Sequence, residues 1–442
     1  MPTKTWYNII YFCNILRIRL GGFNLEQKTV AIVCGGGPAP GINSVISAVT
    51  IEADKNGWDV IGVYDGFSYL AQGEPKTVKL TYDNVSTIHL RGGCILHMAR
   101  FNPTKNEKDL QSVVQTLRGM GVNNLVTIGG DDTAYSAAKV SEYARKLGEP
   151  INVVHVPKTI DNDLPLPEGV PTFGFETARQ FGASVVNNLM EDARTTNNRW
   201  YLGIAMGRTA GHLALGIGQS AGAIITIIPE DFSEEKIRLQ TVIDMLVGSI
   251  VKRYAVDRNY GVAIVAEGVI EKIVQEDLCS AEECCLDEHG HIRYAEIDFG
   301  GLIKKCLSQE LKKIGLKITL VDKEIGYELR CVPPIAYDIE YTRSLGYAAF
   351  NYLAEGKSDA IVTMQCGEIK ALKFDEIRDS ITGKTQVRRV DTTSMHYKIA
   401  QEYMVKFIEE DFNDEQKSAK LAKIMNMDIV EFKNRYSYLL NV

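Results

Sequence analysis

The sequence predicts an α/β protein made of two Rossmann-like, three-layer α/β/α domains, with mainly parallel sheets and an active site in the cleft between them. Short apolar runs alternate with segments of helical periodicity, which is typical of a parallel sheet covered by helices on both faces. The alternation starts again after residue 172, and a chain of 442 residues is too long for a single core. Because ligands of such folds bind outside the strand C-termini, the loops there are expected to carry the function.

The first series opens with a strand, a glycine-rich loop and a helix. Thr29 to Cys34 is a continuous apolar run, and Gly35 to Gly41 forms the loop. From Ile42 to Lys55, apolar residues recur at helical spacing. Further strands are expected at 60–64, 124–128 and 151–156, and further helices at 107–119 and 133–147.

The second series repeats the pattern and leads into a helical tail. Its strands are expected at 200–205, 223–228 and 261–266, and its helices at 176–194, 211–221 and 233–252. Residues 326–337 are predicted to form a loop and 341–355 a helix. The charged segment 395–442 is expected to be helical and to serve packing or an interface.

Composition excludes several classes of protein. Hydrophobic residues make up 45% and charged residues 24% of the chain, as in ordinary globular proteins. The net charge of −7, without a long basic stripe, argues against nucleic acid as the main partner. The apolar run at 9–16 is too short to span a membrane and lacks a signal cleavage site, so we expect a packed strand or short helix and no membrane partner.

Nine scattered cysteines without a CxxC pair make a disulfide framework improbable and favour the reducing cytoplasm. Five cysteine and histidine residues, which are common metal ligands, occur in the acidic stretch 275–290 and just after it: Cys279, Cys284, Cys285, His289 and His291. Their spacing matches no zinc pattern, so we interpret this stretch as a variable insertion.

Glycines and acids follow three of the predicted strands. Gly35-Gly36-Gly37 can bring N–H groups close to an anion at a helix N-terminus, although such glycines are more often packing devices, and the loop lacks the Gly-Lys-Ser/Thr of a P-loop. Asp131 and Asp132 follow Gly129-Gly130, where helix N-capping is the simpler explanation. Each feature alone therefore leaves its role open.

The stretch Pro157 to Asp163 is richer, with a cation, a hydroxyl and two carboxylates in seven residues. Asp161 and Asp163 lie two positions apart, so on an extended segment both would face the same way. A pair of like charges in a cleft raises one pKa and suits base or metal work. An Asx-rich turn before Pro165 explains the same residues equally well.

Taken together and in order, these segments resemble the 6-phosphofructokinase family. The resemblance rests on GGGPAPGIN at 35–43, Arg91 and Arg100 in their glycine-rich segment, GGDDT at 129–133, PKTIDND at 157–163, MGR at 206–208, Glu267 before Gly268, and GYELR at 326–330 with Pro333-Pro334. It covers roughly residues 29–350, and PKTIDND followed by MGR is its most specific part. Neither terminal extension carries a family motif.

The resemblance implies a role for each matching residue. Asp161 would take the proton from the sugar 1-hydroxyl, Asp163 would assist it, and Thr159 would hold the transferring phosphoryl group. The implied catalytic residues are Asp161, Thr159, Asp163 and Arg208; the donor-binding residues are Gly36, Gly37, Arg91, Gly130, Asp132 and Lys158; the metal residue is Asp131, for Mg²⁺; and the sugar-phosphate residues are Thr159, Asp161, Arg199, Met206, Gly207, Arg208, Glu267, Tyr327 and Arg330. Arg199 would reach a neighbouring subunit, so the resemblance implies a homo-oligomer, either a dimer or a tetramer.

Two positions bear on the phosphoryl donor. Members that use pyrophosphate resemble this chain at Asp132 and Lys158, where ATP-using bacterial members carry glycine. An aspartate at 132 adds bulk and negative charge where the α-phosphate of a nucleotide would lie, and Lys158 supplies a cation. Some ATP-using members also carry the lysine, so Asp132 is the discriminator. Val321 and Pro38 depart from the family pattern: the first replaces an arginine that in some members reaches across subunits, and the second an acid of the glycine loop.

The resemblance thus implies reversible transfer from pyrophosphate to fructose 6-phosphate, in glycolysis and gluconeogenesis. The implied domains are an extension at 1–27, a phosphate-donor-binding domain at 28–172, a fructose 6-phosphate-binding domain at 173–325, and a segment at 326–442 that returns to the first domain and ends in a helical extension. The alternatives are an ATP-dependent enzyme of the same fold and a non-catalytic regulatory subunit. Lipid and dinucleotide kinases share a Gly-Gly-Asp strand end but lack PKTIDND and MGR.

Overall fold

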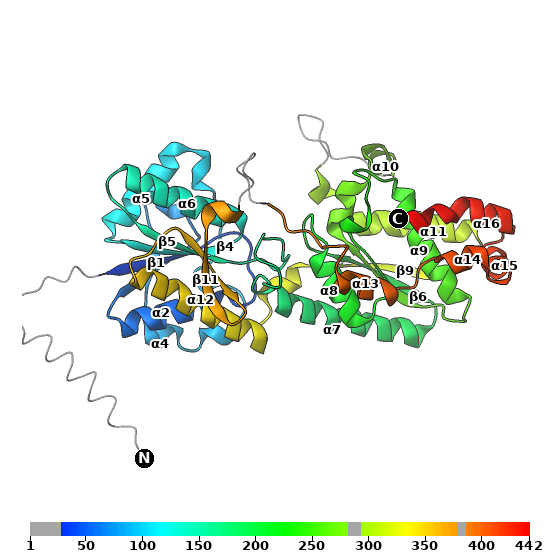
Figure 1. The fold of residues 1–442 in the computed structure, drawn as a ribbon, viewed down its shortest axis with the longest axis horizontal. Coiled ribbons are helices and arrows are strands. Elements are labelled where there is room, and N and C mark those ends of the chain that lie inside the picture. Colours follow the sequence, from blue (N-terminus) through cyan, green and yellow to red (C-terminus); the bar gives the residue numbers. More distant parts are fainter. Residues whose placement is uncertain (1–27, 282–292, 378–385) are drawn as a thin grey trace, which may run out of the picture.

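The computed structural model describes residues 28–281, 293–377 and 386–442, which form two lobes side by side (Figure 1). The extension at 1–27 and most of the insertion, including Cys284, Cys285, His289 and His291, lie outside the described residues. Each lobe is built on one sheet, and every strand of the second sheet is parallel to its neighbours. The predicted pair of three-layer α/β/α units is therefore confirmed.

The first sheet has seven strands in the order β11-β10-β5-β4-β1-β2-β3. Only the two outermost pairs, β10 with β11 and β2 with β3, are antiparallel. The strands are β1 (Thr29–Cys34), β2 (Asp59–Val63), β3 (Thr77–Leu80), β4 (Asn124–Gly129), β5 (Asn152–Pro157), β10 (Ala360–Gln365) and β11 (Glu368–Lys373). All residues of β1 and β4 are buried, as expected for central strands covered on both faces.

Helices cover both faces of this sheet (Figure 1). The helices α2 (Ile42–Lys55) and α12 (Ala336–Ala354) pack on one face, and α5 (Glu107–Gly119) and α6 (Asp131–Lys146) pack on the other. Shorter helices are α3 (Ser68–Ala71) and α4 (Tyr82–Val85). In the register, Ile128 pairs with both Cys34 and Val156, so the loops after β1, β4 and β5 leave the same edge of the sheet.

The second sheet has four parallel strands in the order β7-β8-β6-β9. They are β6 (Arg199–Ala205), β7 (Ile225–Ile227), β8 (Gly261–Ala266) and β9 (Thr319–Ile325), and the helices of this lobe are α7 (Phe175–Thr196), α8 (His212–Ala221), α9 (Leu239–Tyr254), α10 (Gln275–Ala281) and α11 (Phe299–Lys313). Ala205 is in register with Ala266 and with Ile325. Consequently the segments that begin at Met206, Glu267 and Gly326 emerge together.

The C-terminal part of the chain visits both lobes. After α12, β10 and β11 in the first lobe, it crosses to the second and adds α13 (Met395–Glu402), α14 (Glu409–Asn413), α15 (Glu415–Ile424) and α16 (Ile429–Tyr436). Phe407 contacts the rings of Phe412, Phe432 and Tyr436 in a buried aromatic cluster. A Cβ at Gly248 of α9 would lie 2.7 Å from the Phe407 ring, so the tail packs directly on the second lobe.

Several elements differ from the sequence-based predictions. The strands β3, β9, β10 and β11 were not predicted; in β9 and β11, at sheet edges, exposed polar residues interrupt the apolar pattern. Helix α9 was predicted from residue 233 but begins at Leu239, because the backbone of Ile237 pairs with Lys272 and Val274. Helix α12 begins at Ala336, before the predicted start at 341.

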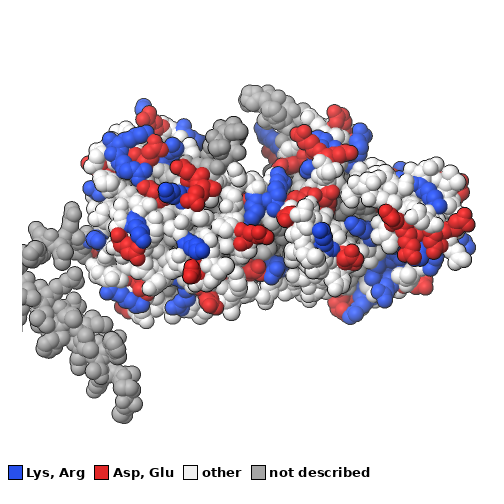
Figure 2. Space-filling model, in the orientation of Figure 1, with Lys and Arg blue, Asp and Glu red and all other residues white. Residues whose placement is uncertain are grey.

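Surface charge, helix hydrophobicity and the state of the cysteines can also be compared with the predictions from sequence. Figure 2 shows acidic and basic side chains mixed over this face of both lobes, with no continuous basic stripe on the face in view. No helix within the described ranges is long and apolar enough to span a membrane. Among the described cysteines, five are free thiols (Cys34, Cys94, Cys306, Cys331 and Cys366), while Cys279 is disulfide-bonded, a bond that was not predicted from the sequence.

Candidate active site

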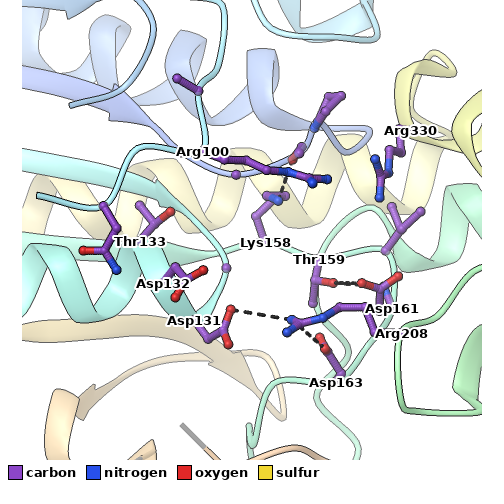
Figure 3. Close-up of a pocket in the computed structure, with 18 of the residues that line it drawn as sticks. Arg100, Asp131, Asp132, Thr133, Lys158, Thr159, Asp161, Asp163, Arg208 and Arg330 are labelled. Carbon is purple, nitrogen blue, oxygen red and sulfur yellow. Dashed lines mark hydrogen bonds and ion pairs between the residues drawn. The ribbon is translucent and has the colours of Figure 1, made fainter. Parts of the chain in front are cut away.

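A cavity of about 360 Å³ opens where the first lobe faces the second (Figure 3). The loops after β1, β4 and β5 supply most of its lining, and the second lobe adds Arg208. Eleven of the predicted site residues line it: Gly36, Gly37, Gly130, Asp131, Asp132, Lys158, Thr159, Asp161, Asp163, Arg208 and Arg330. Residues from seven separate parts of the sequence thus meet in one pocket.

Two glycine loops form one wall of the pocket. Gly35 and Gly129 approach Thr133 so closely that a Cβ at either would lie 2.4 Å or 2.3 Å from its Oγ1. Only glycine allows β1, β4 and the start of α6 to come together here. Gly36, with φ of 83°, turns the backbone in the left-handed region. Lys158, which follows β5, connects to this loop, because its Nζ donates a hydrogen bond to the Gly37 carbonyl at 2.6 Å.

Lys158 is the buried cation of this wall, with 6% of its surface exposed. Burial lowers its pKa to about 8, although the charge of Asp161 opposes that change. Arg330 lies beside it, since a Cβ at Gly37 would be 3.5 Å from the Arg330 Nη1. The pocket therefore holds two cations against the glycine loop, as an anionic ligand requires.

The carboxylates follow Lys158 on a turn, not on an extended segment. Asn162 has φ of 57°, in the left-handed region, so the reason given from sequence for Asp161 and Asp163 facing the same way is wrong. Both nevertheless line the pocket. Asn162 accepts hydrogen bonds at Oδ1 from the amide of Thr172, at 3.0 Å, and from its hydroxyl. These bonds come from a residue ten positions further along the chain, so they do not form the local Asx turn that the sequence had offered as the alternative to the pocket.

Asp161 is held on one side only. Its Oδ2 accepts a hydrogen bond from the Thr159 hydroxyl at 3.1 Å, whereas its buried Oδ1 has no hydrogen-bond partner in the described part of the chain. Burial, followed by the charge of Glu267, raises the pKa of Asp161. Burial and then the charge of Asp161 raise the pKa of Asp163 to about 6. Raised carboxylate pKa values of this kind mark a group suited to accept a proton near neutral pH.

Arg208 links the second lobe to these carboxylates (Figure 3). Its Nη1 lies 3.2 Å from Asp163 Oδ2 and 3.6 Å from Asp131 Oδ1. The backbone of Arg208 is left-handed, with φ of 55°. Glu267 stabilises this turn, because its Oε1 accepts from the amides of Gly207 at 3.0 Å and Arg208 at 2.6 Å.

Asp131 and Asp132 begin α6 but do not cap it. Gly130 occupies the N-cap position without a side-chain hydrogen bond, so the capping explanation offered from sequence is wrong. Asp131 is paired with Arg208, and the exposed Asp132 lines the pocket. Both carboxylates lie in the first turn of the helix, where the macrodipole stabilises negative charge.

Six predicted residues lie outside the pocket lining: Arg91, Arg199, Met206, Gly207, Glu267 and Tyr327. Met206, Gly207 and Glu267 form or hold the turn that carries Arg208, and the Tyr327 ring stacks 4.8 Å from the Arg330 guanidinium. Arg199 begins β6, at the strand end opposite Met206, and pairs there with Asp192 at 2.5 Å.

The sequence-based site omitted nine residues that line the pocket: Gly35, Pro38, Phe67, Ala99, Arg100, Phe101, Asn102, Thr133 and Ile160. Arg100 was part of the family resemblance but received no role, and Arg91 was chosen instead. Neither the phenylalanines nor Asn102 carries a charge or a motif, so nothing in the sequence distinguishes them from other loop residues. Arg100, Phe101 and Asn102 reach the pocket because the loop before η2 (Pro103–Lys105) folds over it, whereas Phe67 lies just before α3.

Sequence comparison agrees with this geometry. The sequence pattern of the phosphofructokinase family matches residues 29–353. The chain belongs to the phosphofructokinase family. It is 51% identical over 415 residues to a protein of Thermotoga maritima named pyrophosphate–fructose 6-phosphate 1-phosphotransferase, covering 92% of this chain and 98% of that protein. A Naegleria fowleri protein of the same name is 47% identical, with 93% and 96% covered.

Solved structures of family members share the fold. The pyrophosphate-dependent phosphofructokinase from Marinobacter aquaeolei superposes with a TM-score of 0.64 at 17% identity, covering 91% of this chain and 92% of that one. The phosphofructokinase of Saccharomyces cerevisiae gives 0.62 at 19% identity, with 94% of this chain and 50% of that one covered. At these identities the likeness shows the fold alone.

Proposed function

We propose that this protein transfers a phosphoryl group from pyrophosphate to the 1-hydroxyl of fructose 6-phosphate, reversibly, giving fructose 1,6-bisphosphate and phosphate. The observation that carries the choice of donor is Asp132, a carboxylate lining the pocket one residue after the acid that pairs with Arg208. Relatives at 51% and 47% identity bear the name of this activity. Glycolysis and gluconeogenesis in the cytoplasm are the corresponding setting.

Asp161 is the proposed general base. The free Oδ1 of Asp161 accepts the proton of the sugar 1-hydroxyl while the oxygen of that hydroxyl attacks the terminal phosphorus of pyrophosphate. The bond from that phosphorus to the bridging oxygen breaks, and phosphate leaves. Thr159 fixes the other carboxylate oxygen and thereby orients the base. Asp163, with its raised pKa, and Arg208 complete the charge balance beside it.

The donor is proposed to lie along the glycine loops. Gly36, Gly37 and Gly130 let backbone groups approach phosphate oxygens, and Lys158 neutralises the leaving phosphate. Asp132 repels the additional phosphate of a nucleotide. Arg100 lines the same pocket and is a better candidate for donor contact than Arg91, which lies outside the lining.

The sugar phosphate is proposed to lie toward the second lobe, against the turn of Met206, Gly207 and Arg208 that Glu267 supports. Arg330 and Tyr327 would bind its 6-phosphate, Arg330 as a bidentate donor. Arg199 is too far along β6 to reach the pocket of its own chain, which supports its proposed role at a neighbouring subunit's site in a dimer or tetramer.

Mg²⁺ fits the acids present, with Asp131 as its proposed residue. No group of three His, Cys, Asp or Glu side chains among the described residues could hold a metal by itself. Magnesium in phosphoryl-transfer sites, however, takes only one or two carboxylates and relies on the substrate phosphates for the rest. When bound, it would neutralise charge on the diphosphate oxygens.

A donor assay tests the proposal. Purified protein is expected to turn over fructose 6-phosphate with pyrophosphate and not with ATP, in a coupled assay that follows fructose 1,6-bisphosphate. The Asp132→Gly variant is expected to gain activity with ATP. Robust activity of the unaltered protein with ATP alone would sink the choice of donor, and an Asp132→Gly variant that still ignores ATP would sink the steric argument.

A further inference from the structure

The segment at 386–394 runs from the first lobe to α13 in the second (orange in Figure 1). It follows the family pattern, which ends at residue 353. At its start the amide of Arg388 donates to the carbonyl of Asp163 at 2.8 Å. The chain therefore touches the proposed catalytic turn directly on its way to the other lobe.

All three guanidinium nitrogens of Arg388 donate hydrogen bonds to the turn and to the segment that follows it. Its Nε donates to the carbonyl of Asn162 at 3.0 Å, its Nη2 donates to Asn162 Oδ1, and its Nη1 donates to the carbonyl of Val170 at 2.8 Å. Both oxygens of Asn162, backbone and side chain, are thus bound by one side chain. A planar guanidinium can make this set of bonds, and a lysine ammonium cannot reproduce its geometry.

The residue so held is the one that sets the direction of both carboxylates. Asn162 stands between Asp161 and Asp163 with φ of 57°, in the left-handed region, which asparagine tolerates better than most L residues. Arg388 and Thr172 together hold Asn162 in this conformation, and loss of the Arg388 bonds leaves only those from Thr172. A change of φ at Asn162 would turn Asp161 relative to Asp163 and disturb their contacts with Thr159 and Arg208.

The same segment also holds the loop that carries Arg208. Arg389 Nη1 donates to the carbonyl of Thr209, and the amide of Val390 donates to Glu230 Oε1 at 3.0 Å. Glu230 in turn accepts from the amide of Gly211 at 3.1 Å. Three consecutive residues therefore connect the carboxylate turn of one lobe to the arginine turn of the other.

We propose that Arg388 is a positioning residue for the reaction: it fixes the Asn162 turn, and the segment it begins sets the carboxylates of one lobe against Arg208 of the other. This role rests on the proposed function, because it needs Asp161 as the base. Arg388 lies outside the pocket lining, so it acts through the residues it holds and not by touching substrate.

Turnover of Arg388→Ala separates positioning from mere stability. We expect kcat with pyrophosphate to fall by about 10²-fold, the effect typical of a small misplacement of catalytic groups, while KM for fructose 6-phosphate changes by less than about threefold. Arg388→Lys is expected to stay near the alanine value, and added guanidinium to restore part of the lost kcat of Arg388→Ala. Unchanged kcat in both variants would overturn the proposal.

Arg253→Ala is the matched control. Arg253 is a buried arginine of α9 that donates to the carbonyl of Tyr260 at 3.2 Å, away from the pocket. It is expected to lower thermal stability without the loss of kcat and without rescue by guanidinium. If Arg253→Ala loses kcat and responds to guanidinium as Arg388→Ala does, the effect at Arg388 is general and the positioning role is refuted.

Amide hydrogen exchange gives a readout that needs no turnover. In Arg388→Ala the peptide covering 159–163 is expected to exchange faster than in the unaltered protein, and in Arg253→Ala it is not. Equal exchange in all three proteins would contradict the proposal even if the enzyme used another donor. Conversely, inactivity of the unaltered protein with pyrophosphate would refute the proposed function and leave the exchange result interpretable.

Discussion

Replacing Asp163 by asparagine is expected to make the protein more stable and less active. Asp163 is 5% exposed, and burial followed by the charge of Asp161 raises its pKa from 3.8 to about 6. Because the pKa of this carboxyl is higher in the folded than in the unfolded protein, the folded state is favoured at pH values below the unfolded-state pKa of 3.8. This stabilisation is lost as the pH rises through about 6. At pH 8 the ionised carboxylate therefore costs about 3 kcal/mol, at about 1.4 kcal/mol for each pKa unit, and Asp163→Asn removes that cost.

The cost depends on pH, which provides the assay. The gain in the free energy of unfolding is about 3 kcal/mol at pH 8 and about half of that at pH 5, so the rise in Tm of Asp163→Asn should be larger at pH 8. Asp192→Asn is the control: hydrogen bonds from Tyr201 and Arg199 lower the pKa of Asp192, so its replacement should not raise Tm. A Tm of Asp163→Asn that is unchanged at pH 8, or raised equally at both pH values, would refute the reasoning.

Three further expectations concern the same pocket. Asp161→Ala should reduce kcat by orders of magnitude while fructose 6-phosphate still binds, measured by calorimetry, and unchanged turnover would be fatal to its role as base. Since burial lowers the pKa of Lys158 to about 8, KM for pyrophosphate should rise above pH 8, and Lys158→Gln should lack this rise. Gly129→Ala places a Cβ 2.3 Å from Thr133 Oγ1 and 2.4 Å from Thr133 Cβ and should lower Tm, and adding Thr133→Ala should recover little because that Cβ remains; no loss of Tm would contradict the close approach.

Central elements were predictable and edge elements were not. Strands β1, β4 and β5 are apolar on both faces, so their composition alone marks them, and α2 and α5 were predicted with the bounds that the structure has. At sheet edges one side of a strand meets solvent, and β9 and β11 consequently carry polar residues that hide their periodicity.

The site shows the same division. Motifs of charged and glycine residues identified eleven residues that line the pocket, because anion chemistry restricts which residue types can serve. Phe101 and Asn102 were missed because lining a pocket requires no particular residue type. The left-handed turn at Asn162 was missed as well, since the residues that bind Asn162, Thr172 and Arg388, lie farther along the chain.

The sequence by itself determined the two α/β units, the family and the chemistry of the pocket. Local composition is enough for these, because apolar runs specify strands, and glycines and acids at strand ends specify what can bind there. Only the tertiary structure decided how the parts are held: Arg208 between Asp131 and Asp163, and the segment beginning at Arg388 spanning both lobes. Contacts between residues far apart in sequence depend on how the chain folds back on itself, and no local pattern records them.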